Sequence, residues 1–138
     1  MRRFAKAMKR KTKLKLVVIR INLRDWLGNY VKCYNAGPDE FLGLIKNAEM
    51  VFTNSFHAIA FSIIFKKKFW AFTYCKEGLS SQTRIEYLLK NCGLTNRMIN
   101  ENSSIVDWDE KIDYLCTERF LSKKIHESKQ KLMREINV

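Results

Sequence analysis

Several features are scarce in this sequence of 138 residues, and the lack of long apolar runs excludes a class of protein. There are one proline, five glycines and two histidines, and no internal repeat or low-complexity segment is visible. The longest apolar run, Ala58 to Phe65, contains Ser62 and stops at Lys66, far short of the roughly 20 residues that cross a bilayer. Hydrophobic residues make up 46% of the chain, which excludes a disordered protein. We expect one globular domain without a transmembrane helix.

The cysteines do not form a metal-binding pattern. They are widely spaced, form no Cys-x-x-Cys pair and have no histidine at ligand spacing, so no metal site is expected. The absence of a signal peptide and the place of Cys92 on an apolar helix face favour reduced thiols. We therefore expect a cytoplasmic protein, and association with a membrane surface stays open. The four positions are Cys33, Cys75, Cys92 and Cys116.

Positive charge is concentrated at the N-terminus. Eight of the 26 lysines and arginines precede Leu16, whereas all 14 acidic residues follow it. The remainder, with 18 basic and 14 acidic residues, is only mildly basic. Residues 1–13 are predicted to be a basic arm; we favour a solvated terminus, and contact with anionic lipid or a linker role are the alternatives. Aromatic residues do not alternate with the basic ones as a stacking platform requires, so nucleic acid is not an expected partner.

From residue 14 onward, short apolar strands alternate with helices. Strands are predicted at residues 14–21, 30–34, 51–53 and 69–73. Such alternation predicts an α/β fold, with a Rossmann-like parallel sheet and flanking helices, as a single domain over residues 14–138.

The predicted helices have start and stop signals. Pro38 occupies the first turn of a helix whose apolar positions follow at spacings of three and four residues, and Gly93 ends a helix from about Gln82 to Cys92. From Asp107 the pattern is helical again and predicts two C-terminal helices that meet near Ser122.

The stretch from Met50 to Lys68 carries the strongest candidate for a site. An apolar strand passes through the polar turn of Asn54 and Ser55 into an almost wholly apolar helix. With Ser55 as the N-cap, His57 lies in the first helical turn, where backbone N–H groups lack intrahelical acceptors and the helix dipole is positive. An anion is favoured at such a position.

This stretch also carries a family resemblance. Ser55-Phe56-His57 with its apolar helix, together with residues 37–48, 84–89 and 93–97, resembles the C-terminal part of the polysaccharide pyruvyl transferase family over roughly residues 36–100. Members transfer pyruvate from phosphoenolpyruvate to a sugar as a ketal. Their two-domain fold is similar to GT-B glycosyltransferases, so the resemblance implies the C-terminal domain of such a fold.

The resemblance implies roles for particular residues. His57 would be the catalytic residue, as a general acid or as a phosphate ligand, whereas without the resemblance it is more simply a histidine at the rim of a buried helix. The donor carries a carboxylate and a phosphate and needs at least two cations, for which Lys76 and Arg84 are the candidates, each with a surface charge as the alternative. Asn54 and Ser55 are capping residues that are also able to bind the donor. Phosphoenolpyruvate is a substrate, and no cofactor is expected.

The chain is short for this family. Its members are roughly twice this length, so we expect the family's N-terminal domain to be missing, with a truncated chain, a degenerate reading frame or a partner chain as the three explanations. We expect an incomplete enzyme that self-associates through its exposed cleft surface. The expected acceptor is a sugar or lipid-linked glycan of surface polysaccharide biosynthesis.

Two other functions stay open. A GT-B-like half that binds a nucleotide sugar is the first, although no acidic motif for a ribose or metal is visible. A non-catalytic anion- or membrane-binding module is the second.

Overall fold

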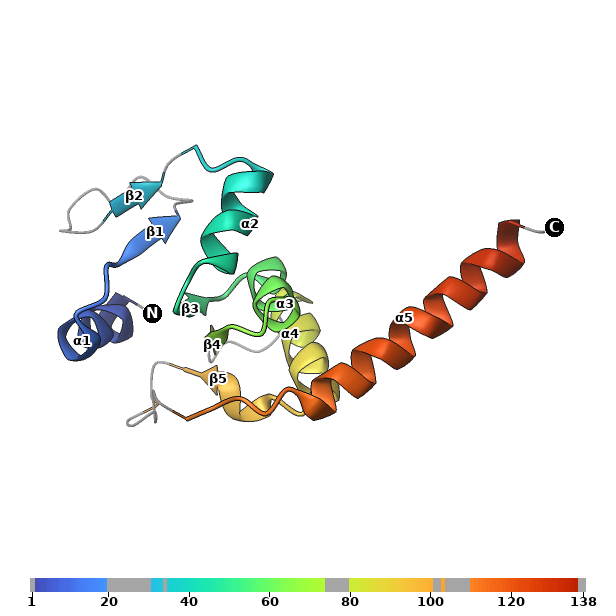
Figure 1. Cartoon of the computed structure of the whole chain (residues 1–138). Coiled ribbons are helices and arrows are strands. Elements are labelled where there is room, and N and C mark those ends of the chain that lie inside the picture. The colour runs from blue at the N-terminus through green and yellow to red at the C-terminus, as the bar shows by residue number, and fades with distance from the viewer. Residues whose placement is uncertain are drawn as a thin grey trace.

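The computed structural model describes residues 2–19, 31–33, 35–73, 80–100, 103 and 110–136. These residues form an α/β structure in which short parallel strands are covered by helices (Figure 1). The elements in chain order are α1 (Arg2–Thr12), β1 (Val17–Ile19), β2 (Val31–Cys33), α2 (Pro38–Lys46), β3 (Met50–Thr53), α3 (Phe56–Ile64), β4 (Lys68–Phe72), α4 (Ser80–Asn91), the 3-10 turn η2 (Thr95–Arg97), β5 (Met98–Ile99) and α5 (Leu115–Ile136).

The main sheet has three strands in the order β3-β4-β5, and both strand pairs are parallel. Met50 pairs with Lys68 across β3 and β4, and Ala71 pairs with Met98 across β4 and β5. A separate pair joins β1 to β2, also in parallel. Because parallel neighbours need a crossover, α3 and α4 return the chain between successive strands of the main sheet. The predicted α/β class with a parallel sheet is confirmed, whereas β5 was not predicted because two residues carry no readable periodicity.

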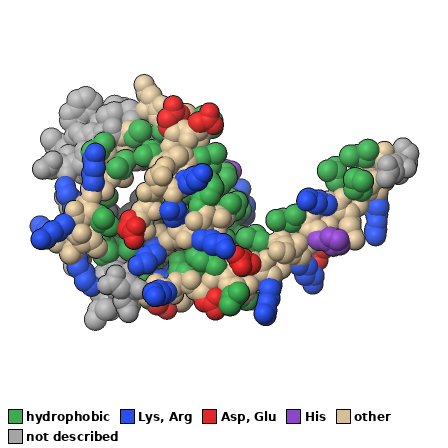
Figure 2. All heavy atoms as spheres, in the orientation of Figure 1, with side chains coloured by type: hydrophobic (Ala, Val, Ile, Leu, Met, Phe, Trp, Pro, Cys, Tyr) green, Lys and Arg blue, Asp and Glu red, His purple; other side chains and the backbone are tan. Residues whose placement is uncertain are grey.

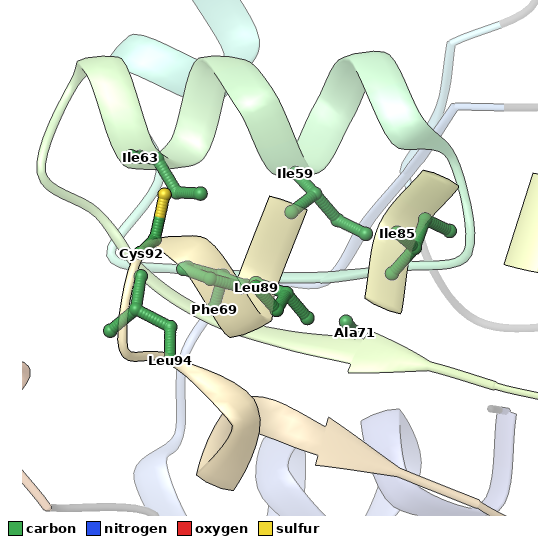
Figure 3. Close-up of a cluster of buried hydrophobic side chains, with 8 residues drawn as sticks. All are labelled: Ile59, Ile63, Phe69, Ala71, Ile85, Leu89, Cys92 and Leu94. Carbon is green, nitrogen blue, oxygen red and sulfur yellow. The ribbon is translucent and has the colours of Figure 1, made fainter. Parts of the chain in front are cut away.

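One face of the main sheet is covered by α3 and α4. Side chains alternate between the faces of a strand, so Phe69 and Ala71 of β4 point to this side. They pack with Ile59 of α3 and Leu89 of α4, each of which is fully buried (Figure 3). The complete cluster is Ile59, Ile63, Phe69, Ala71, Ile85, Leu89, Cys92 and Leu94.

The opposite face of the sheet packs against α1. Trp70 and Phe72 alternate with Phe69 and Ala71 along β4 and form a second cluster with Ile99 and, from α1, Phe4. The Phe4 and Phe72 rings meet edge to face with 6.0 Å between centroids. Met8 of α1 is buried as well. The expectation of a solvated N-terminal arm is therefore wrong, because apolar side chains of α1 pack against the core.

The end of α4 follows from Gly93. This residue has φ +70, and the backbone N–H groups of Gly93 and Leu94 donate to the carbonyls of Lys90 and Leu89 at 3.2 and 2.8 Å. This pair of hydrogen bonds is a Schellman motif, which requires a left-handed residue at that point. The predicted helix stop at Gly93 is confirmed.

The C-terminal segment is a single helix, α5, and the predicted break near Ser122 is wrong. Neither glycine nor proline occurs within α5, and serine alone is too weak a signal to end a helix. Its first turns are attached to the body, because Thr117 donates a hydrogen bond to the carbonyl of Cys92 at 2.9 Å and Leu121 packs on the core. Figure 1 shows the rest of α5 extending away from the other elements. No helix in the described part of the chain is long and apolar enough to cross a membrane.

Candidate anion-binding site

The N-terminus of α3 is built by the turn that leaves β3. Thr53 ends the strand, and its side-chain oxygen accepts a hydrogen bond from the backbone N–H of Ser55 at 3.0 Å. Ser55 is extended, with φ −88 and ψ 125, and its hydroxyl accepts from the N–H of Ala58 at 3.5 Å. The predicted N-cap is thereby confirmed, and it fixes where the helix begins.

His57 stands in the first turn of α3 and is exposed. The first N–H groups of a helix have no intrahelical acceptor and form the positive end of its dipole. No acidic side chain lies in this turn to balance that charge. The buried part of α3 follows immediately, with Ala58 and Ile59 in the core. The helix thus exposes His57 at its N-terminus while the residues that follow are buried.

Arg84 reaches the same place from α4. Because β3 and β4 are parallel, the helices that follow them begin at the same edge of the sheet. The guanidinium carbon of Arg84 lies over the Phe56 ring, 5.6 Å from its centroid. The His57 ring also contacts the Phe56 ring, edge to face, with ring centroids 5.9 Å apart and planes at 83°. Two of the predicted site residues therefore converge on one phenylalanine.

Phe56 itself was not among the predicted site residues. It is half-buried against the core formed by α3 and α4, and it contacts both Arg84 and His57. Its place between Ser55 and His57 was visible in the sequence, but an apolar residue at the start of an apolar helix is ordinarily assigned to the core. Only the approach of α4 identifies it as the support of a cation.

The remaining predicted site residues have different outcomes. Asn54 is exposed and lies directly before the N-cap. Lys76 lies outside the described residues, so its role stays a prediction. Among the residues that the structure describes, no group of three or more histidine, cysteine, aspartate or glutamate side chains is placed to hold a metal ion.

Arg97, which the resemblance also included, lies in a structural position. Its side chain is only 2% exposed, and its guanidinium carbon is 4.8 Å from the centroid of a Trp70 ring. It also forms an ion pair with Glu110 at 3.0 Å and donates to the carbonyl of Lys111 at 3.3 Å. Arg97 therefore anchors the segment that follows residue 109 to the sheet.

The fold and these contacts define a class: a parallel α/β domain in which a helix N-terminus, with His57 and Arg84 beside it, stands at the carboxyl edge of the sheet. A model of the polysaccharide pyruvyl transferase family matches residues 1–76, more than half of the chain, and the chain therefore belongs to that family. The comparisons with curated proteins and with solved structures found no significant match.

The match corrects the expected extent of the resemblance. It begins at residue 1 and ends at residue 76, whereas residues 36–100 were expected, so the description of this chain as the family's C-terminal half is not borne out. Asn54, Ser55, His57 and Lys76 lie within the matched range. Arg84 lies beyond it, and its place in the site depends on its position against Phe56 alone.

Proposed function

We propose that this chain binds phosphoenolpyruvate at the N-terminus of α3 and takes part in transferring its pyruvyl group to a pair of sugar hydroxyls as a ketal. Membership of the pyruvyl transferase family supports the reaction class. The convergence of Arg84 and His57 on Phe56 is the observation that carries the assignment of the site. The acceptor is a sugar in a surface polysaccharide or its lipid-linked precursor.

The charges of the donor fit two separate features of the site. Phosphoenolpyruvate has a carboxylate and a phosphate, and both need cationic partners or N–H donors once water is displaced. The end of α3 supplies backbone N–H groups and a positive dipole. Arg84 supplies a guanidinium whose planar set of N–H donors matches either anionic group. One anionic group at the helix end and the other on Arg84 would hold the donor next to His57.

The reaction requires one proton to be delivered. A sugar hydroxyl attacks the central carbon of phosphoenolpyruvate and loses its proton, while the methylene carbon gains a proton and becomes a methyl group. A second hydroxyl then attacks the same carbon, loses its proton, and the carbon–oxygen bond to phosphate breaks. In this proposal His57 donates a proton to the methylene carbon as a general acid or holds the phosphate as it leaves.

Calorimetric titration of phosphoenolpyruvate into the full chain tests the site. The chain has two histidines, so His126→Ala is a matched control for His57→Ala. His126 is exposed on α5, where its Nε2 lies 2.9 Å from Nε2 of Gln130. We expect phosphoenolpyruvate to bind the wild-type chain and His126→Ala equally, and His57→Ala to bind about tenfold more weakly, as the loss of one charge-assisted hydrogen bond requires.

Competing ligands separate the alternatives. If a nucleotide sugar bound more tightly than phosphoenolpyruvate and His57→Ala weakened it, the glycosyltransferase interpretation would replace ours. Equal binding of inorganic phosphate and phosphoenolpyruvate would reduce the site to a general anion site. Circular dichroism of each variant establishes that it is folded, and the absence of binding by a folded wild-type chain would contradict the proposal.

A further inference from the structure

The outer part of α5, residues 122–136, is an exposed helix. Every residue in this range is exposed, and Figure 1 shows the segment extending away from the other elements. Isolated helices of about 12–15 residues are marginal in water, and most helices in proteins are stabilised by packing an apolar face. A surface that covers one face of this segment would supply that stabilisation.

The segment has such an apolar face. Ile125, Leu132 and Ile136 follow one another at spacings of seven and four residues, which places them on one side of a helix, with Met133 beside them. These four side chains, which we call the α5 stripe, are between 53% and 66% exposed. Figure 2 shows hydrophobic side chains gathered along one side of this part of the molecule.

The α5 stripe continues a line that is already packed at its inner end. Leu121 precedes Ile125 by one helical turn and packs against the core formed by α3 and α4. The same helical side therefore carries apolar residues from the body outward, with Lys129 among them. A separate function for its outer part is indicated because the core of the described domain does not reach it.

The charges on this segment are predominantly positive. It carries five basic residues against Glu127 and Glu135, and Lys124 forms an ion pair with Glu127 at 2.7 Å. At about 100° per residue, Lys129 falls within the stripe, between Ile136 and Met133. Lys124 and Lys131 fall on one flank of the stripe, and Lys123 and Arg134 fall on the other. The basic residues are Lys123, Lys124, Lys129, Lys131 and Arg134.

This charge pattern selects the occupant. Two copies of α5 that met through their stripes would bring lysine-bearing flanks together, and like charges repel. A planar anionic surface instead accepts lysines from both flanks, because their long stems allow the ammonium groups to reach headgroups while the apolar face is buried. The N-terminal arm, the other basic segment, is less suited because Phe4 and Met8 are already used in packing.

We propose that residues 122–136 bind the surface of an anionic lipid membrane, with the α5 stripe at the boundary between headgroups and acyl chains. The helix lies along the surface and does not span it, as its length and charge require. Lysines near an anionic leaflet add to the affinity electrostatically. This inference is independent of the proposed function, because it uses no residue of the site at α3.

Co-sedimentation of the full chain with vesicles tests the proposal. Vesicles of phosphatidylglycerol and phosphatidylcholine present an anionic surface, and vesicles of phosphatidylcholine alone are the comparison. We expect binding to the anionic vesicles that falls with added salt. The double variant Ile125→Ser/Leu132→Ser should lower the partition coefficient by about tenfold or more, since it removes two large apolar side chains from the buried face. Lys131→Gln/Arg134→Gln, which removes one cation from each flank, should lower it by roughly tenfold.

Ile64→Ser is the matched control for the stripe. Ile64 lies on α3 and is 57% exposed, close to the 53% of Ile125. It should leave vesicle binding unchanged, which separates the stripe from apolar exposure in general.

Four outcomes would overturn the proposal. The first is no binding to anionic vesicles by the folded chain. The second is equal loss in the Ile64 and stripe variants. The third is binding that disappears in Arg10→Gln/Lys11→Gln but persists in the stripe variants, which would assign the contact to α1. The fourth is a stable dimer in sedimentation that Ile125→Ser/Leu132→Ser dissociates, which would assign the stripe to a second copy.

Discussion

The guanidinium of Arg84 lies over the ring of Phe56, 5.6 Å from the ring centroid, although the two residues belong to different helices. A cation over a ring face is attracted by the ring quadrupole without using its N–H donors. Arg84 is therefore positioned by Phe56 while its donors stay available for an anion. This relationship joins the start of α4 to the start of α3 and gives the site a second cationic component.

Removal of Arg84 is expected to weaken phosphoenolpyruvate binding. Arg84→Ala should lower the affinity by about tenfold to a hundredfold, since hydrogen bonds to charged groups contribute about 1.5–3 kcal/mol. Arg84→Lys should fall between this variant and the wild type, because lysine keeps the charge but not the planar donor set. Calorimetric titration measures both. Arg119→Ala, at an exposed arginine of α5, is the control, and a loss of equal size there would refute a specific role for Arg84.

Arg97 is expected to matter for stability. Arg97→Met removes the cation from Trp70 and breaks the ion pair with Glu110, and should lower the free energy of unfolding by about 2–3 kcal/mol. Glu110→Gln should cost no more than about 1 kcal/mol, because the Glu110 side chain is 45% exposed. Urea denaturation followed by circular dichroism gives both values. Equal losses in the two variants would place the stabilisation in the ion pair instead of the ring contact.

Stability is expected to fall in alkaline solution because of Cys92. Burial raises the pKa of the Cys92 thiol from 9.0 to about 11, and the neighbouring Cys116 adds to the shift. Between pH 9 and pH 11 the unfolded thiol loses its proton while the folded one keeps it, so the free energy of unfolding falls as the pH rises. The Cys92 contribution should reach up to about 2 kcal/mol.

Cys92→Ala isolates this contribution. Denaturation curves are recorded at pH 8, 9, 10 and 11, to span about two units on the pKa scale. The free energy of unfolding should fall more steeply with pH for the wild type than for the variant. Parallel pH profiles for the two proteins would show that other groups cause the loss.

Glycine substitutions should have opposite effects inside α2 and just after α4. Gly93→Ala places a side chain at φ +70 and brings its Cβ to 3.4 Å from Sγ of Cys116, so it should destabilise the fold by about 1–2 kcal/mol. Gly43 lies inside α2 with no atom within 4 Å of an added Cβ. Gly43→Ala should therefore stabilise by roughly 0.5–1 kcal/mol. Thermal unfolding checks the pair, and a stabilising Gly93→Ala would contradict the role given to the Schellman motif.

Local signals in the sequence predicted much of the fold. The capping serine at residue 55, the proline at residue 38 and the glycine at residue 93 each act through the adjacent backbone, and the structure confirms the element that each one starts or ends. The predicted break at Ser122 failed because serine only weakly disfavours a helix and no stronger breaker is present.

The position of the site was partly predictable. His57 follows a strand and lies in the first turn of a helix, and that place can be deduced from its neighbours in sequence. The contact of Arg84 with Phe56 could not be predicted from the sequence. It depends on the parallel pairing of β3 and β4, which brings the starts of two helices to one edge of the sheet.

The sequence by itself determined the α/β class, the N-terminus of α3 and the family resemblance, because periodicity, caps and motifs are properties of neighbouring residues. The tertiary structure decided that α1 packs on the sheet, that Arg97 is buried on Trp70 and that Phe56 holds Arg84. It also decided which apolar residues of α5 the domain leaves exposed. These features depend on contacts between residues far apart in the chain, whose side-chain chemistry alone does not say which partners they meet.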